Sequence, residues 1–234
     1  MLWRWFFLVP VCPWLLGLVP LSWHDSFLTR VELLALIETL NAELLSHSSA
    51  TLTLERWCGG HGMAPEPKLV ARLDRGAVKH LDDKDRERLA VASESELRYR
   101  HVLLFCGDKL LSEADNWYVP GRLTPEMNRL LEETGTPFGR VVRDLDFKRE
   151  TLSAKLLWSP LSGEWDVSPE PPASPPGSLI EAPDHILEHR AILRANGGTP
   201  FSFVAETYTR EVLAFPLPEQ LSTRPRPGTN PGAP

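Results

Sequence analysis

An arginine and a glutamate are the residues of this chain best suited to bind a small acid. Arg100 opens the apolar stretch RHVLLFC, and Glu206 lies in the middle of the largely apolar stretch FSFVAETYT. A guanidinium offers a carboxylate a planar pair of donors, which lysine cannot reproduce. A carboxyl group partly removed from water can hold or exchange a proton near a ligand hydroxyl. The pair therefore predicts a site for a small, carboxylate-bearing ligand.

Both residues also have an ordinary structural interpretation. An arginine at the start of a strand is usually a surface residue or a salt-bridge partner. In a regular strand Glu206 shares its face with Val204, Tyr208 and Arg210. A surface ion pair with Arg210 is therefore the alternative to a buried carboxylate.

Neither the histidines nor the cysteines form a metal-binding pattern, and no metal is expected. His185 and His189 have a helical spacing, but they lie in a predicted strand, and neither they nor His101 have a third ligand nearby. Three cysteines are too few for a disulfide framework. In an oxidising compartment Cys58 and Cys106 could pair, and otherwise Cys106 is a small buried hydrophobe.

The composition predicts a globular domain with appendages. Hydrophobic residues make up 42% and charged residues 24% of the 234 positions, which suits a chain with a buried core. A net charge of −6 gives no basic face, so no nucleic-acid partner is expected. The 22 prolines gather near the N-terminus, in 160–183 and in the tail. We therefore predict a domain at 26–215 with a proline-rich insertion at 160–183 and a disordered tail at 216–234.

Residues 1–25 form a hydrophobic leader. One positive charge followed by an apolar run is typical of a signal peptide or a membrane anchor. Pro10, Pro13 and Pro20 interrupt the run, and no clear cleavage site precedes Ser22. The alternatives are translated residues upstream of the domain, or an N-terminal strand of the core. We expect an exported, periplasmic or membrane-associated protein if the leader is real, and a cytoplasmic one otherwise.

The hydrophobic periodicity predicts helices and strands in a mixed order. Thr29 and Glu32 have the spacing of a capping box before a helix whose leucines recur at helical intervals. Thr51–Trp57 alternates as a half-buried strand. Thr124 is a suitable cap for a short helix that begins at Pro125.

Two hairpins complete the predicted sheet. One runs from Arg100 to Val119 around a Gly-Asp turn, and the other from Ile186 to Ala214 around an NGG turn. Extended structure is also expected at 69–73 and 141–158. Short strands joined by turns, with helices on one side, indicate an α+β domain built on an antiparallel sheet.

In this order and spacing, the elements resemble those of the chorismate–pyruvate lyase family and the related ligand-binding domains of some bacterial repressors, a chorismate lyase-like or UTRA-like superfamily. The resemblance covers roughly 33–215 and rests on ETLNAELLSHSSATLTLERW, RHVLLFC with its return strand ending in VP, GTPFGR, and GGTPFSFVAE. It implies a single antiparallel sheet with helices that cover an internal ligand cavity. It also implies conversion of chorismate into 4-hydroxybenzoate and pyruvate, with no metal or organic cofactor.

The resemblance also implies site residues. The ligand-binding arginine of the family corresponds to Arg100, and the glutamate that faces the ring hydroxyl corresponds to Glu206, so both are expected to be catalytic. The backbone of Phe138 would touch the ligand. Leu40 would line the site, or Asn41 if the register slips by one residue.

One departure weakens the lyase interpretation. The lyases carry a second arginine on the return strand, where this chain has Asn116. Chorismate has two carboxylates, so one of them would meet a neutral partner unless Arg140, Arg190 or Arg194 substitutes. The alternative is a non-catalytic binding protein for a small aromatic carboxylate in the same cavity. In either case we expect a monomer, which the N-terminal segment attaches to a membrane if it is an anchor.

Overall fold

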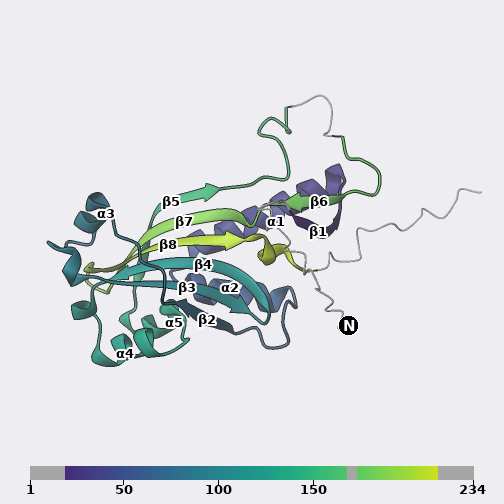
Figure 1. Cartoon of the computed structure of the whole chain (residues 1–234). Coiled ribbons are helices and arrows are strands. Elements are labelled where there is room, and N and C mark those ends of the chain that lie inside the picture. The colour runs from purple at the N-terminus through teal and green to yellow at the C-terminus, as the bar shows by residue number, and fades with distance from the viewer. Residues whose placement is uncertain (1–18, 168–172, 216–234) are drawn as a thin grey trace, which may run out of the picture.

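Strands dominate the part of the chain that the structure describes. The computed structural model describes residues 19–167 and 173–215, and Figure 1 shows their arrangement. The strands are β1 Val19–His24, β2 Leu69–Asp74, β3 Arg98–Cys106, β4 Lys109–Tyr118, β5 Lys148–Leu156, β6 Leu179–Ala182, β7 His185–Arg194 and β8 Pro200–Thr209. The helices are α1 Phe27–Ser46, α2 Ala50–Gly60, α3 Asp83–Arg88, α4 Pro125–Glu133 and α5 Phe138–Val141.

Six strands form one antiparallel sheet in the order β2-β3-β4-β8-β7-β5. Strands β1 and β6 pair separately as a two-stranded antiparallel sheet. The α+β class and the large antiparallel sheet predicted from the sequence are therefore confirmed. The small second sheet is an addition to the single sheet that we predicted.

Four helices cover one face of the six-stranded sheet. Helices α1 and α2 pack on it in one hydrophobic cluster, and α4 and α5 pack on it in a second. The opposite face carries a third cluster, which joins Trp117 and Phe203 to the chain around α3. The sheet is therefore enclosed most thickly on the face that α1, α2, α4 and α5 cover.

The strand register places a polar set on this helix-covered face. Two neighbouring rows of residues cross β3, β4, β8 and β7: the first is Arg100, Asn116, Val204 and Ala191, and the second is Val102, Ala114, Glu206 and His189. Because side chains two residues apart on a strand share a face, both rows point toward the helices. The two predicted site residues therefore lie on one face, one row and two strands apart.

The prediction of a strand at Thr51–Trp57 is wrong, because these residues belong to α2. The alternating pattern TLTL also fits a helix, in which Ala50, Leu54 and Trp57 come to lie on one buried side. The side chain of Ser49 accepts a hydrogen bond from the backbone amide of Leu52 and caps the helix. The cap is the local signal that distinguishes the helix from a strand.

Two further boundaries differ from the prediction. Ser26, three residues before Thr29, is the cap of α1, and its hydroxyl accepts a hydrogen bond from the Thr29 amide. The expected extended segment at 141–158 begins only at Lys148, since α5 and a 3-10 turn occupy 138–145. The predicted cap of α4 at Thr124 is confirmed.

Parts of the predicted leader and insertion belong to the fold. Strand β1, within the leader, pairs with β6, within the insertion, and Trp23, Ile180 and Ala182 are buried in the core. This agrees with the alternative that the leader ends in a core strand. The rest of the leader, 1–18, and the predicted tail, 216–234, lie outside the described residues. Among the described helices, none is long and apolar enough to cross a membrane.

A disulfide joins Cys58 of α2 to Cys106 at the end of β3, with 6.6 Å between the Cα atoms. Of the two possibilities left open for these cysteines, the structure has the pair. The bond closes a segment of 48 residues and ties α2 to the helix-covered face of the sheet. It therefore stabilises the layer that encloses the polar rows.

Reduction of this disulfide is expected to lower the free energy of unfolding by about 4 kcal/mol, the chain-entropy value for a loop of this length. Urea titrations with and without dithiothreitol measure the effect. The Cys58→Ala/Cys106→Ala double variant is the control, because its urea midpoint should be the same with and without dithiothreitol. Equal midpoints for the wild type, with both thiols shown to be free, would contradict the bond.

Candidate functional site

Arg100 is a buried arginine without a carboxylate partner. It is 5% exposed, and its Nη2 donates to the backbone oxygens of Thr136 at 3.0 Å and Thr134 at 3.5 Å. Its Nε and Nη1 are buried and have no hydrogen-bond partner among the described residues. No carboxylate of the described chain forms a salt bridge with it. This guanidinium therefore keeps donors and charge that the fold itself does not use.

Burial is the main influence on the charge of Arg100. It lowers the pKa of the Arg100 guanidinium to about 10, with a smaller contribution in the same direction from Arg75 and an opposing one from Tyr118. The side chain is still cationic at neutral pH. An unpaired cation in this position costs folding free energy, and an anion that reaches it would recover that cost.

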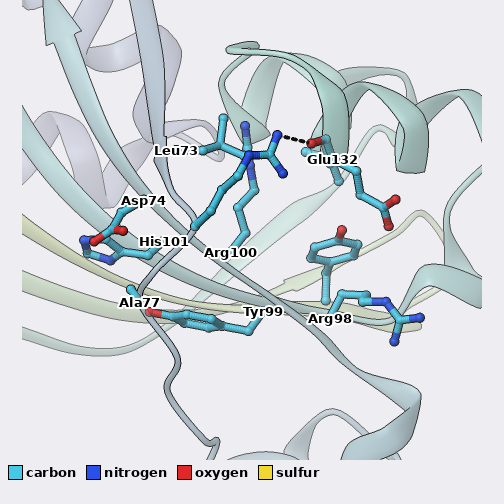
Figure 2. Close-up of a pocket in the computed structure, with 11 residues that line it drawn as sticks. Leu73, Asp74, Ala77, Arg98, Tyr99, Arg100, His101 and Glu132 are labelled. Carbon is cyan, nitrogen blue, oxygen red and sulfur yellow. Dashed lines mark hydrogen bonds between the residues drawn. The ribbon is translucent and has the colours of Figure 1, made fainter.

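A hollow of about 370 Å³ lies beside Arg100. Figure 2 shows Arg98, Tyr99 and Arg100 of β3 around it, with Glu132 from α4. Its lining also includes Leu73, Asp74, Arg75, Ala77, His101, Tyr118 and Leu131. The volume is in the range of small-ligand sites, and the lining is mixed in charge.

Glu206 is buried in an ion pair that the sequence did not predict. It is 8% exposed, and its Oε2 accepts hydrogen bonds from Nη2 of Arg149 at 2.5 Å and from the hydroxyl of Tyr208 at 3.1 Å. Arg210, the partner considered in the surface alternative, pairs with Asp184 instead. Glu206 is therefore a buried carboxylate with a dedicated cation.

Arg149, the partner of Glu206, is the residue of this candidate site that the sequence did not predict. It lies on the edge strand β5, whose sequence KRETLSAKL is mostly polar and gives no sign that the arginine side chain turns inward. The side chain is nevertheless only 4% exposed. Burial acts to lower the pKa of Arg149, but Glu206 and Tyr208 outweigh it, and the pKa is raised. Arg149 is therefore cationic, whereas burial raises the pKa of Tyr208 and keeps its hydroxyl a neutral donor.

His189 completes the network beside Glu206. Its ring is fully buried, and Nε2 lies 2.9 Å from Oδ1 of Asn41 on α1. Burial lowers the pKa of His189 to about 4, so the ring is neutral at physiological pH. Asn41, the alternative to Leu40, thus reaches the polar rows. Leu40 itself packs in the hydrophobic cluster between α1 and the sheet.

A second, much smaller cavity lies between Glu206 and the ends of α2 and α5. Asn116, Phe138, Arg149 and Glu206 line it together with Ser48, Ser49, Ala50, Thr51, Val102, Leu104, Ala114, Gly139, Phe147, Leu193 and Val204. The free space is about 20 Å³, which is room for about one water molecule. Phe138 closes this space from α5 and packs against Tyr118 and Phe201.

The structure brings Arg100 and Glu206 to one face but not into one cavity. Arg100 lines the larger hollow, while its cross-strand partner Asn116 and its same-face neighbour Val102 line the smaller cavity with Glu206. From the strand spacing and rise, the Cα atoms of Arg100 and Glu206 are about 12 Å apart. Two long side chains at this spacing can hold opposite ends of one aromatic ring if the cavity beneath α5 opens.

Other predicted residues lie elsewhere. Arg190 pairs with Asp85 on the opposite face of the sheet, and Arg140 pairs with Glu55. Neither arginine therefore supplies a positive charge beside Asn116. Arg194 does not supply one either, because it pairs with the exposed Glu150. In 19–167 and 173–215, no group of three or more His, Cys, Asp or Glu side chains could hold a metal ion.

The fold and the site define an α+β protein with a buried arginine–glutamate pair and a second, unpaired arginine on one sheet face. The chain is 53% identical over 198 residues to the uncharacterized protein y4mC of Sinorhizobium fredii (strain NBRC 101917 / NGR234), covering 84% of this chain and 83% of that one. It therefore belongs to the same family as y4mC. No family model matches the chain.

Solved structures offer only a distant likeness. The possible transcriptional regulator YydK from Bacillus subtilis is 13% identical, with a TM-score of 0.38 and coverage of 64% of this chain and 62% of that one. A GntR-family transcriptional regulator from Enterococcus faecalis V583 is 15% identical, with a TM-score of 0.39 and coverage of 63% and 99%. At these scores the likeness supports no inference about function.

The buried His189 predicts a loss of stability in mild acid. Its pKa is about 4 in the folded chain against 6.5 for an unperturbed histidine. The unfolded state therefore binds more protons between these values, and the free energy of unfolding falls as the pH drops from about 6.5 to about 4. The expected loss is on the order of 3 kcal/mol. Urea unfolding of wild type and His189→Phe across this range measures it, and equal pH slopes would contradict it.

The two buried arginines should respond to the same substitution in opposite ways. Arg100→Met removes an unpaired buried cation and is expected to raise the free energy of unfolding by about 1–3 kcal/mol. Arg149→Met leaves Glu206 buried without its cation and is expected to lower it by about 3–5 kcal/mol. Urea titration at neutral pH measures both. A similar loss in the two variants would mean that Arg100 serves the fold.

Proposed function

We propose that this chain is a non-catalytic binding protein for a small aromatic carboxylate, and that Arg100 binds the carboxylate. The observation that carries the proposal is the state of the Arg100 guanidinium, buried and cationic, with Nε and Nη1 unpartnered among the described residues. A carboxylate satisfies both donors and the charge at once. The hollow beside Arg100 gives such a ligand access.

The side chains between Arg100 and Glu206 favour a ligand with a flat, apolar ring. Between Arg100 and Glu206 the sheet face carries the small or aliphatic side chains of Val102, Ala114 and Val204, and Phe138 covers them. An aromatic ring can lie in such a layer with little loss of rotational freedom. Because the free space beside Glu206 is about 20 Å³, α5 has to move away from α2 when the ring enters.

Binding without turnover is the better interpretation of the two that the resemblance offers. Glu206 is already held by Arg149 and Tyr208, so it is poorly placed to exchange a proton with a substrate. Asn116 is buried and neutral where the lyases carry their second arginine. A substrate with two carboxylates, such as chorismate, would find one unpaired guanidinium among the described side chains of this face. Chorismate lyase activity is therefore the weaker candidate.

The disulfide supports a location outside the reducing cytosol. Disulfides persist in oxidising compartments such as the periplasm and are rare where glutathione and thioredoxin keep thiols reduced. The Cys58–Cys106 bond thus favours export of this protein. A binding protein for a small acid is compatible with that location, whereas chorismate is an intracellular metabolite.

Titration of the full chain with 4-hydroxybenzoate by calorimetry tests the proposal. We expect saturable binding by the wild type and a loss of affinity of about thirtyfold or more in Arg100→Met, because the ligand charge loses its buried partner. Arg143→Met is the matched control, because the Arg143 side chain is 70% exposed. This variant should bind the ligand with the affinity of the wild type. Equal affinity in folded Arg100→Met would remove Arg100 as the anchor.

Incubation of the same protein with chorismate tests the absence of turnover. The proposal predicts that 4-hydroxybenzoate and pyruvate form no faster than in buffer. Product formation that is lost in Arg100→Met would instead establish the lyase. Chromatography of both products, with the enzyme-free reaction as reference, gives the answer.

A further inference from the structure

We propose that one end of the folded domain docks on the surface of a lipid bilayer through exposed apolar side chains. This contact is separate from the ligand site and adds to any attachment by the leader. We call the area the docking surface, and its residues are Phe27, Leu28, Leu156, Leu157, Val167 and Leu179.

Exposed apolar residues are concentrated on the docking surface. Of the nine large hydrophobic residues that are exposed in the described chain, six belong to it, with exposed fractions from 38% to 77%. Single exposed apolar side chains are common on soluble proteins, but a group of them marks an interaction surface. The docking surface is therefore a candidate for contact with a membrane or another protein.

The beginning of α1 brings two distant segments of the docking surface together. His24, which comes just before α1, pairs with Leu179 of β6. The ring centroid of Phe27 lies 6.2 Å from that of Trp165, and Val167 follows two residues later. Residues from α1, β6 and the segment before 168 therefore lie around one helix turn.

The end of β5 reaches the same turn of α1. Arg30 donates a hydrogen bond from Nη1 to the backbone oxygen of Pro160 at 3.3 Å, and Pro160 is three residues after Leu157. Figure 1 shows β1, β6 and the beginning of α1 at one end of the six-stranded sheet, whereas α4, beside the Arg100 hollow, lies toward the other. A bilayer at the docking surface would therefore leave the hollow open to water.

The leader joins the fold next to the docking surface, and this favours a lipid partner. Residues 1–18 directly precede β1, and Arg4 is the one charged side chain in their sequence. Strand β1 pairs with β6, which carries Leu179. An apolar segment that enters a bilayer would hold the docking surface against the headgroups. Trp165 suits that position, since tryptophan is enriched where membrane meets water.

The charges around the docking surface favour neutral lipid over a second copy of this chain. Glu164, Asp166 and Glu181 are exposed there, and Arg30 is paired with Asp25 at 2.7 Å. A two-fold contact between copies would bring the same acids close to one another, and like charges repel. Zwitterionic headgroups carry no net charge, so apolar contact alone would provide the binding free energy.

Hydroxyl-radical footprinting of the full chain, with and without phosphatidylcholine vesicles, tests the proposal. We expect vesicles to slow the oxidation of the docking surface several-fold, because lipid replaces water around its side chains. Val70 and Val78 are 55% and 75% exposed and lie outside the docking surface, so their oxidation should not change. This internal comparison separates docking of the domain from insertion of the leader.

A triple variant of the full chain gives a second measurement. Phe27→Ser/Leu28→Ser/Leu179→Ser should lower the partition constant for phosphatidylcholine vesicles, measured by sedimentation, by about tenfold or more. The matched control, Leu45→Ser/Val70→Ser/Val78→Ser, removes three exposed apolar side chains from other places and should bind as the wild type does. Addition of anionic lipid should not strengthen binding by any of these proteins.

Three results would overturn the proposal. One is a full chain that does not bind the vesicles, or that binds them without protection of the docking surface. Another is an equal loss of binding in the two triple variants. The third is protection of the docking surface without vesicles: if it grows with protein concentration a second copy covers the surface, and if it does not the chain itself does.

Discussion

Two arginines are buried on the same face of one antiparallel sheet, and a carboxylate accompanies only one of them. Arg149 pairs with Glu206, whereas Arg100 has no acidic partner in the described chain. A buried charge is costly unless it is paired, so this asymmetry constrains the rest of the site. The fold satisfies the cation at one end of the polar rows and leaves the other end for an anion from outside.

The sheet and its cover enforce this arrangement. The pairing of β3, β4 and β8 fixes which side chains face the helices, and α2, tied to β3 by the Cys58–Cys106 bond, closes that face together with α5. The row of Arg100 and Asn116 borders both spaces, because Arg100 lines the hollow and Asn116 lines the small cavity at Glu206. We propose that a ligand occupies both spaces when α5 moves, with its carboxylate at Arg100 and its far end at Glu206.

The sequence predicted more of the sheet than of the site. Hairpins with clear turns and alternating apolar residues were found correctly, as was the cap at Thr124. The TLTL segment was misassigned, because four alternating residues satisfy both a strand and one turn of a buried helix. Arg149 could not be predicted, since an arginine in a polar edge strand looks exposed until the register places it opposite Leu193. The roles of Arg100, Phe138 and Glu206 stay predictions that rest on the resemblance and on their placement.

A crystal structure of the full chain with 4-hydroxybenzoate would show whether Arg100 binds the carboxylate. We expect the ligand carboxylate within hydrogen-bond distance of Nε and Nη1 of Arg100, with the ring over Val102 and Ala114 and the hydroxyl near Glu206. We also expect α5 to be displaced from α2. A ligand bound elsewhere, with the Arg100 nitrogens still unpartnered, would contradict the role of Arg100 as the anchor.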